Sequence, residues 1–448
     1  QVPKKYLALG MMAIANIAFA SVPLVFNTPP KPPKQFDEST YRLGWDIDMS
    51  PFAGGEDLLF LHRCIERFEG YMISKSPVYY SKAIQARIWR FSELFLGWMP
   101  LNFLAIVAQH EVFGHGYRIR DIGRGTKITG FQFSAPPPYG PGGGATSYDI
   151  SSHFTMVDET CVAMAGVEST AIIALLTKFK WLESGAIDPR QTVLYLLGQY
   201  DLPLYIGTLK ALKKLSSEDQ EESIKGHDMV AYVRSLNQTY PQSLLSVGRL
   251  RSITWINLAD PFTFYAIYAW LHYVSSGKET TIPMIPIGAY RYLPGLRFGL
   301  SPFGPEYFWE HFLVCQKRPY YFYLKAGRHA KNNYFGAGLY VPKIYSLGDW
   351  SIGARLDTWR QPKLLLQQGQ IPFSEVELSQ KPNPQDPLYP YSQQHAMRVG
   401  AGLSMIVDYK VSQRTGFEAE LGYKAKGFVP GESLFASPIA RLYFTLFF

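Results

Sequence analysis

The strongest constraint on the fold is a hydrophobic period of two residues in the last third of the chain. The segment 397–409, MRVGAGLSMIVDY, places apolar residues at alternate positions and mainly Arg, Gly, Ser and Asp between them. The segments 350–358 and 416–425 repeat this alternation. Because successive side chains of a β-strand point to opposite sides of a sheet, the pattern predicts strands with one apolar and one polar face.

The alternation predicts a transmembrane β-barrel, apolar toward lipid and polar inside, of about eight antiparallel strands. Eight strands leave room inside only for side chains, so we interpret the barrel as an anchor and not as a pore. A soluble β-sandwich or barrel packed on the rest of the chain is the alternative. The strands are expected near 286–301, 307–315, 319–329, 333–343, 348–359, 396–409, 414–425 and 438–448. The charged residues expected inside are Arg355, Asp357, Arg398, Asp408, Glu418, Glu420, Lys424 and Arg441.

The chain ends in ARLYFTLFF, with apolar residues at every second position up to Phe448. This segment resembles the C-terminal strand of bacterial outer-membrane barrels, in which a final Phe is part of the assembly signal. The resemblance implies a bacterial outer-membrane protein with membrane lipid as a partner. Long connections at 360–395 and 426–437 are expected outside the cell and short turns on the periplasmic side. The region before the barrel is therefore expected in the periplasm.

The N-terminus has the pattern of an export signal. Lys4 and Lys5 precede an apolar run that ends in Ala18-Phe19-Ala20. A basic start, an apolar centre and an A-x-A site predict a signal peptide at 1–20. A retained membrane anchor is the alternative. A Pro-rich linker at 21–39 is expected to follow.

Residues 40–282 are expected to form a mostly α-helical domain, and residues 283–448 the barrel. The fold class is therefore α+β and multidomain. Within the helical domain, the segment 216–228, SSEDQEESIKGHD, is interpreted as a solvated, charged connector. The helices contain two expected breaks, at Pro100 and around Asp201 and Pro203, because proline removes a helical hydrogen bond. The segment SAPPPYGPGGGATS at 134–147 is expected to be a loop.

The composition fits a membrane-associated protein. Charged residues make up 18% of the chain, below the roughly 25% usual for soluble domains. The net charge of +8 is spread along the chain and includes no run of five basic residues, so no nucleic-acid partner is expected. The three cysteines show no CxxC spacing, which indicates small buried residues and not a disulfide framework.

The segment VAQHEVFGHGYR at 107–118 carries the candidate chemistry, with His110, Glu111 and His115. In an ideal α-helix, residues five apart point about 140° apart, which is too far to share a metal ion. A single π-type turn absorbs one extra residue and brings such side chains to one face. Gly114 tolerates this distortion, so the spacing predicts a π-turn between the histidines. Chance spacing of two unrelated histidines is the alternative.

HEVFGH resembles the HExxGH motif of dipeptidyl peptidase III, a zinc exopeptidase family. The resemblance covers these six residues. It implies that His110 and His115 bind Zn²⁺ and that Glu111 is the catalytic base. Zinc bound by two imidazoles and a third protein ligand keeps one position for water and lowers its pKa to about 7. Glu111 would then take the proton from that water.

Glu168 is the residue expected to be the third ligand. It is the one charged residue in CVAMAGVESTAIIALL, and Ala165 and Gly166 beside it would let another helix approach closely. Two histidines from one helix and a Glu from another is the gluzincin arrangement. DETCVA at 158–163 loosely resembles the EECRA-like segment of dipeptidyl peptidase III and implies Glu159 instead. His153 and Asp158 are further alternatives.

These features predict an outer-membrane-anchored, zinc-dependent metallohydrolase, with peptides or proteins as the expected substrates. Two alternatives stay open. One is an integral inner-membrane protease that cuts within the membrane, although the apolar segments 95–109, 161–176 and 262–274 are each shorter than the roughly 20 residues of a span. The other is a non-catalytic scaffold that binds partners in an envelope complex.

Overall fold

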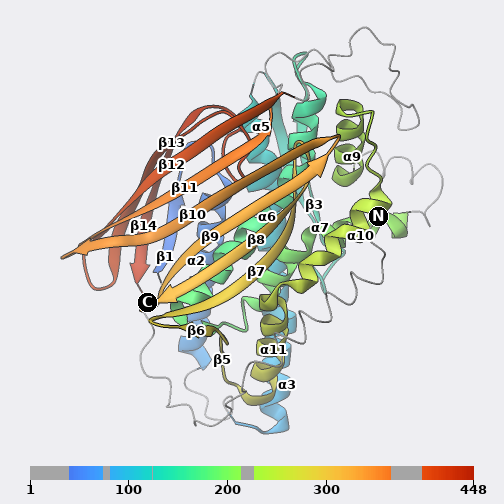
Figure 1. The fold of residues 1–448 in the computed structure, drawn as a ribbon. Coiled ribbons are helices and arrows are strands. Elements are labelled where there is room, and N and C mark those ends of the chain that lie inside the picture. The colour runs from blue at the N-terminus through green and yellow to red at the C-terminus, as the bar shows by residue number, and fades with distance from the viewer. Residues whose placement is uncertain (1–39, 74–80, 124, 213–226, 365–395, 448) are drawn as a thin grey trace.

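A computed structural model describes the fold over residues 40–73, 81–123, 125–212, 227–364 and 396–447 (Figure 1). The predicted signal peptide, the Pro-rich linker and Phe448 lie outside the described residues. A region rich in helices comes first, and an antiparallel sheet forms the C-terminal part, as the change of hydrophobic period predicts.

The sheet has ten antiparallel strands in the order β1-β14-β13-β12-β11-β10-β9-β8-β7-β6. Each of the eight predicted strands is present, which confirms the period-two interpretation. Their bounds are β7 Tyr290–Ser301, β8 Gly304–Cys315, β9 Arg318–His329, β10 Asn332–Leu347, β11 Trp350–Pro362, β12 Met397–Lys410, β13 Thr415–Lys424 and β14 Ser437–Phe447.

Two further strands form the edges of this sheet. The short strand β6 (Ile285–Ile287) pairs with β7, and β1 (Thr40–Trp45) pairs with β14 from Thr40 opposite Phe447 to Trp45 opposite Leu442. The described strands β1 and β6 do not pair with each other, so the sheet is open where the sequence predicts a closed barrel. One edge strand comes from the helical half of the chain, so the sheet is not built from the C-terminal half alone.

The two faces of the sheet differ as the alternation predicts. Leu356 on β11 lies opposite Leu403 on β12, and both side chains are exposed on the outer face. On the inner face Arg441 binds Glu420 at 2.9 Å. Most of the charged residues expected inside are buried or half-buried, although Arg398 is exposed. The sheet therefore has an apolar outer face and an ion-paired inner face.

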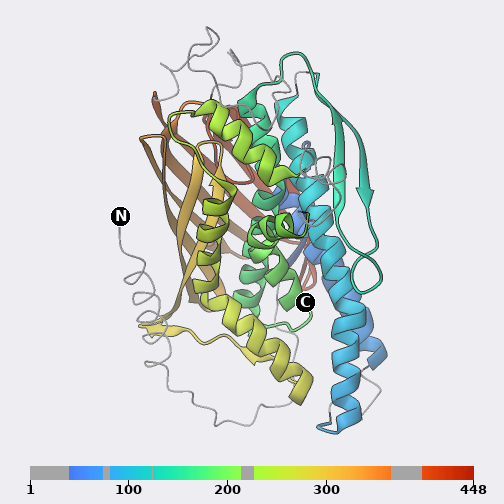
Figure 2. The ribbon, with the colours of Figure 1, turned by 90° about the vertical axis from the view of Figure 1, so that its right-hand side faces the viewer.

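Helices lie against the inner side of the sheet (Figure 2). Their bounds are α2 Pro51–Ile73, α3 Ile84–Ser92, α4 Met99–His110, α5 Gly116–Ile122, α6 Met156–Ser184, α7 Thr192–Leu212, α9 Asp228–Thr239, α10 Val247–Thr254 and α11 Pro261–Ser276. Three shorter turns complete them: the π-helices η1 Glu93–Trp98 and η2 Glu111–His115, and the 3₁₀ turn η3 Trp255–Ala259.

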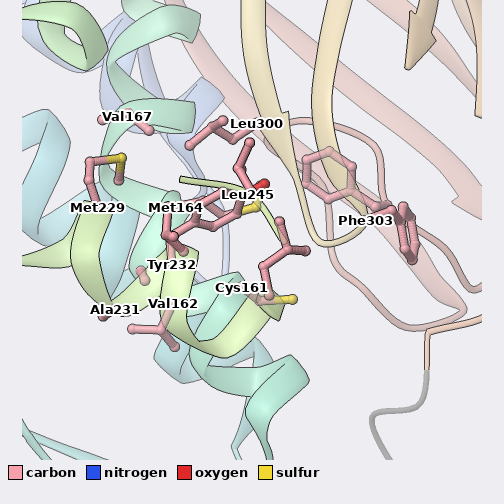
Figure 3. Packing of buried hydrophobic residues seen from close by; sticks show 14 of the residues in the cluster. Cys161, Val162, Met164, Val167, Met229, Ala231, Tyr232, Leu245, Leu300 and Phe303 are labelled. Carbon is pink, nitrogen blue, oxygen red and sulfur yellow. The ribbon is translucent and has the colours of Figure 1, made fainter. Parts of the chain in front are cut away.

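The helix α6 is the centre of the molecule. It begins with a capping box between Thr155 and Asp158 and ends at Gly185 in the left-handed conformation. Two hydrophobic cores hold residues from both helices and strands. In the first, Val162 on α6 and Tyr232 on α9 pack near Leu300 of β7 (Figure 3). Helices and sheet thus share their cores.

The expected helix breaks are absent, and this part of the sequence interpretation is wrong. Residues Ile84–Ile122 form one helical run of 39 residues. Pro100 lies in the first turn of α4, directly after η1, and the wider π-turn accommodates its missing N–H. The helix α7 likewise continues through Asp201 and Pro203.

A β-hairpin follows the long helix. Its strands are β2 (Lys127–Phe133) and β3 (Gly144–Asp149), which pair antiparallel. The predicted loop at 134–147 is therefore shorter than expected, because its last residues, from Gly144, belong to β3. A second small sheet joins β4 (Ala186–Ile187) to β5 (Thr280–Thr281).

Candidate metal centre

The two histidines of HEVFGH face the same side because the helix widens between them. The helix is α-helical up to His110, π-helical from Glu111 to His115, and α-helical again from Gly116. The ring centroids of His110 and His115 lie 4.9 Å apart. The predicted π-turn is confirmed, and it removes the geometric objection to a five-residue spacing.

Glycines bring this helix close to α6. A Cβ on Gly114 would lie 2.8 Å from the carbonyl oxygen of Ala165 and from Cα of Gly166. A Cβ on Gly166 would lie 2.2 Å from Nε2 of His110. The close approach expected at Ala165 and Gly166 is therefore present, and Gly114 is needed for it. Gly166 makes the space that the imidazole of His110 fills.

Asp228 is the third member of the cluster. Its Oδ2 lies 3.1 Å from Nε2 of His115 and 3.5 Å from Nε2 of His110. The ligand atoms of these three residues all lie within 4.8 Å of one another. Asp228 is the first residue of α9, and its neighbour His227 caps that helix by accepting a hydrogen bond from the Met229 N–H. The interpretation of this segment as only a solvated connector missed it.

The structure does not bring Glu168 to the histidines. Arg118 donates to both of its carboxylate oxygens, at 2.8 and 3.1 Å, and the backbone N–H of Gly431 donates at 2.6 Å. A lone carboxylate on a buried apolar helix needs a partner, and here that partner is the buried guanidinium of Arg118 and not a metal ion. Arg118 itself is buried.

The alternative ligands lie elsewhere as well. Glu159 accepts a hydrogen bond from the Tyr148 hydroxyl at 3.5 Å and lies 3.8 Å from Arg234. Asp158 belongs to the capping box of α6, and His153 is exposed in the turn before that helix. None of the three belongs to the cluster found among the described residues.

Hydrogen bonds to the Nδ1 atoms fix the orientation of both imidazoles. Nδ1 of His110 donates to Asp201 at 2.8 Å, and that carboxylate also accepts from the Thr170 hydroxyl. Nδ1 of His115 donates to the carbonyl oxygen of Val162 at 2.8 Å. With protons on both Nδ1 atoms, the neutral rings turn their Nε2 lone pairs toward Asp228. Asp201 therefore orients His110.

The arrangement of donors fits a cation. Two Nε2 atoms and a carboxylate oxygen converge on one point, and positive charge must lie between them, either a metal ion bound by the neutral rings or the protons of charged rings. Without a metal ion, burial lowers the pKa of each histidine, but Asp201 beside His110 and Asp228 beside His115 more than offset this and raise it above its usual value. Burial likewise raises the pKa of Asp228, but the two histidines when charged, His115 first, more than offset this and hold the pKa well below its usual range. Asp228 is therefore a carboxylate at any working pH.

Glu111 is held next to this cluster by the hairpin. The hydroxyl of Thr146 on β3 donates to Oε2 of Glu111 at 2.7 Å. Gly144 lies so close that a Cβ there would be 2.8 Å from Cγ of Glu111. Glu111 is buried against the hairpin. A buried glutamate needs a partner, and the Thr146 hydroxyl is one.

Tyr205 on α7 completes the surroundings. Its hydroxyl donates to Oδ2 of Asp228 at 3.0 Å, and its ring meets the edge of His110 at 5.7 Å between centroids. Burial and, after it, the charge of Asp228 raise the pKa of Tyr205 well above its ordinary value, so the phenol keeps its proton. Neither Tyr205 nor Thr146 carries a sequence signal that would have singled it out.

Comparisons with known proteins do not name a family. No family model matches the chain, and no curated protein matches it. One solved structure, described as the NanC porin structure in a rhombohedral crystal form, aligns with 38% of this chain and 81% of its own, at 12% identity and a TM-score of 0.21. A TM-score this low does not bear on the fold or the function.

Proposed function

We propose that this chain is a membrane-anchored, zinc-dependent hydrolase, with peptide or protein amides as substrates. One observation carries the proposal: His110, His115 and Asp228 converge while Glu111 lies between the two histidines in sequence. Two imidazoles and one carboxylate, with a fourth position for water, is the ligand set of catalytic zinc sites. The ligand set proposed here has Asp228 in the place expected for Glu168.

Each residue of the site has its own role in this proposal. His110, His115 and Asp228 would hold Zn²⁺, which lowers the pKa of a bound water to about 7. Glu111 accepts the proton of the attacking water and passes it to the leaving amine. Thr146 fixes one oxygen of Glu111 and leaves the other to accept that proton. Asp201 and the Val162 carbonyl keep the histidines in the tautomer that the site needs.

Metal content and turnover test this proposal together. Purified protein should hold about one Zn²⁺ per chain and hydrolyse a mixture of fluorogenic peptides, and a chelator should abolish both. Protein that folds and contains no zinc after incubation with zinc salts would contradict the proposal. Zinc that stays bound while no peptide is cut would favour the non-catalytic scaffold.

The anchor in this proposal is the outer face of the sheet, in a bacterial outer membrane. The apolar residues of β11–β14 point outward, while the charged residues pair inside. Placing an Arg at Leu403, which is 60% exposed, should cost about 2–4 kcal/mol near the bilayer midplane and impair assembly. Arg at Ser152, exposed before α6, is the matched control. Equal assembly of both variants would contradict a lipid contact at Leu403.

One observation favours the alternative of a protease that cuts within the membrane. The apolar segments that raise this alternative are each too short by themselves to span a bilayer. The structure joins one of them into the helical run Ile84–Ile122, which is long and apolar enough to cross a membrane and contains the HEVFGH residues. Cleavage within the membrane would require this helix to lie in the bilayer.

A further inference from the structure

The helix that leads to the metal centre has one buried face and one exposed apolar face. Leu94 and Trp98 pack inward with Tyr273 of α11. Between Ile88 and Leu104 the exposed residues other than Gly97 are large and apolar. Apart from Ile88, they are Trp89, Phe91, Phe95, Leu96, Leu101 and Leu104.

The length of this face matches a bilayer. The 17 positions from Ile88 to Leu104 extend about 25 Å along a helix axis, close to the roughly 30 Å of the hydrocarbon core. Two helices here are apolar enough to cross a membrane, but they differ in burial. In its most apolar stretch Met156–Ser184 is 89% buried, whereas Ile84–Ile122 is only 33% buried. The first is a core helix, and the second lacks cover on one side.

The helix α11 adds a second exposed face beside the first. Its exposed apolar residues, Phe264, Ile267, Tyr268 and Leu271, follow the spacing of one helical face. The two helices touch: the rings of Phe91 and Trp270 lie 5.8 Å apart, and the guanidinium of Arg90 donates to the Val274 carbonyl. We name these two exposed faces together the helical belt.

Charged groups are withdrawn from the helical belt. Arg90 is fully buried, and its guanidinium donates to the Val274 and Ser81 carbonyls. Glu93 lies 3.5 Å from Arg190 on the inner side. The exposed cations Lys82 and Arg87 lie at the start of the helix, before the belt begins. Basic residues that flank an apolar stretch are typical of a membrane border.

We propose that the helical belt contacts the acyl chains of the same bilayer as the outer face of the sheet. This inference rests on the membrane anchor of the proposed function. The helix α11 leads through β5 and β6 directly into β7, so the belt continues from the edge of the sheet. Its side chains are large and aromatic, whereas helices that pack on one another in membranes use small residues. Lipid therefore fits this surface better than a second copy of the chain.

The proposal changes the expected location of the helical region. From the sequence, this region is expected as a separate domain in the periplasm. Because helices and strands share two hydrophobic cores, a membrane that holds the sheet also borders the helices. Lipid on α3, α4 and α11 would cover the apolar side chains that are exposed there.

Lipid quenching tests the helical belt directly. In full-length protein with Cys64→Ser, Cys161→Ala and Cys315→Ser, single cysteines at Leu96 or Ile267 would carry a polarity-sensitive thiol fluorophore. Leu403→Cys is the matched probe on the sheet, and Ser152→Cys is the water-exposed control. In vesicles of phospholipid brominated in mid-chain, the probes at 96 and 267 should lose as much fluorescence as the probe at 403. The probe at 152 should lose little.

The four positions separate the outcomes. Quenching at 403 with values at 96 and 267 equal to that at 152 would overturn the helical belt while leaving the sheet as the anchor. No quenching at 403 would contradict the anchor itself, and the belt with it. Protection of 96 and 267 from a water-soluble maleimide without lipid quenching would show that protein covers this face, which also overturns the proposal.

Discussion

Arg118 clamps Glu168 through two hydrogen bonds, at 2.8 and 3.1 Å, where α5 crosses α6. The same guanidinium also donates to Asp121 at 2.9 Å and to the Glu432 carbonyl at 3.0 Å. The pair therefore joins the end of the HEVFGH helix to the loop between β13 and β14. It lies beside the candidate metal centre without belonging to it.

Replacing Glu168 should therefore destabilise the fold and leave the metal in place. Glu168→Gln removes one charged partner of the buried Arg118, and breaking a buried ion pair costs about 3–5 kcal/mol. The cost is expected near the lower end of this range because Asp121 still binds Arg118. Thermal unfolding in detergent should shift to lower temperature, with zinc still near one per chain. Glu159→Gln on the same helix should shift it less, because its contacts are 3.5 and 3.8 Å long. Loss of zinc from folded Glu168→Gln would make Glu168 a ligand after all.

Asp228→Asn should remove the metal from a folded protein. An amide oxygen carries no charge to attract a cation between two imidazoles, so zinc affinity should fall by more than the 10–100-fold typical of outer-shell changes. Equilibrium dialysis against a zinc buffer measures this. Asp149→Asn at the exposed end of β3 is the matched control and should bind as wild type does. Equal affinity of the two variants would exclude Asp228 from the ligand set.

Glu111→Gln should keep zinc and lose turnover. The amide keeps the shape and the hydrogen bond from Thr146 but cannot take a proton, and general-base catalysis contributes roughly 10²–10⁴-fold. Peptide hydrolysis and zinc content are measured on the same sample. Thr146→Val, which only releases one oxygen of the base, should lose less activity. A Glu111→Gln variant that is as active as wild type would leave the site without its proposed base.

Gly114→Ala should weaken both packing and metal binding. The added Cβ meets the backbone of Ala165 and Gly166 at 2.8 Å, and backbone cannot swing away, so overpacking costs about 1–3 kcal/mol. The expected result is a lower unfolding temperature and weaker zinc binding. Gly97→Ala in the neighbouring π-helix is the matched control, because nothing lies within 4 Å of its Cβ position. Identical behaviour of both variants would mean that η2 and α6 can separate freely.

Local patterns predicted the parts of the structure that local physics determines. The alternation around Leu403 and Leu421 predicted strands because the pleat forces a two-residue period within each strand. The π-turn was predictable because two histidines five apart can share one face only through it. The strand β1 was not predictable, since six residues at a sheet edge acquire their structure by pairing with β14.

The proposed third ligand illustrates what sequence alone does not contain. Asp228 lies 113 residues after His115 and is preceded by a charged stretch, so nothing local marks its carboxylate as a neighbour of the histidines. Glu168 stood out because a lone carboxylate on an apolar helix must have a partner. The sequence shows that need but not which cation meets it, and Arg118 lies three residues beyond His115 on the same helix. A His-Asp pair at a helix start was the signal available for Asp228.

The π-turn also preserves the phase of everything that follows it. Deleting one residue between the histidines, such as Val112, would restore the four-residue spacing of common zinc motifs in an ordinary α-helix. Because the π-turn already absorbs this residue, α5 would keep its phase relative to α4, and Arg118, three residues after the histidine in both cases, would still face Glu168. The extra residue is therefore neutral for two constraints at once, the candidate metal centre on one side and the buried ion pair on the other. A lineage could gain or lose it without rebuilding either.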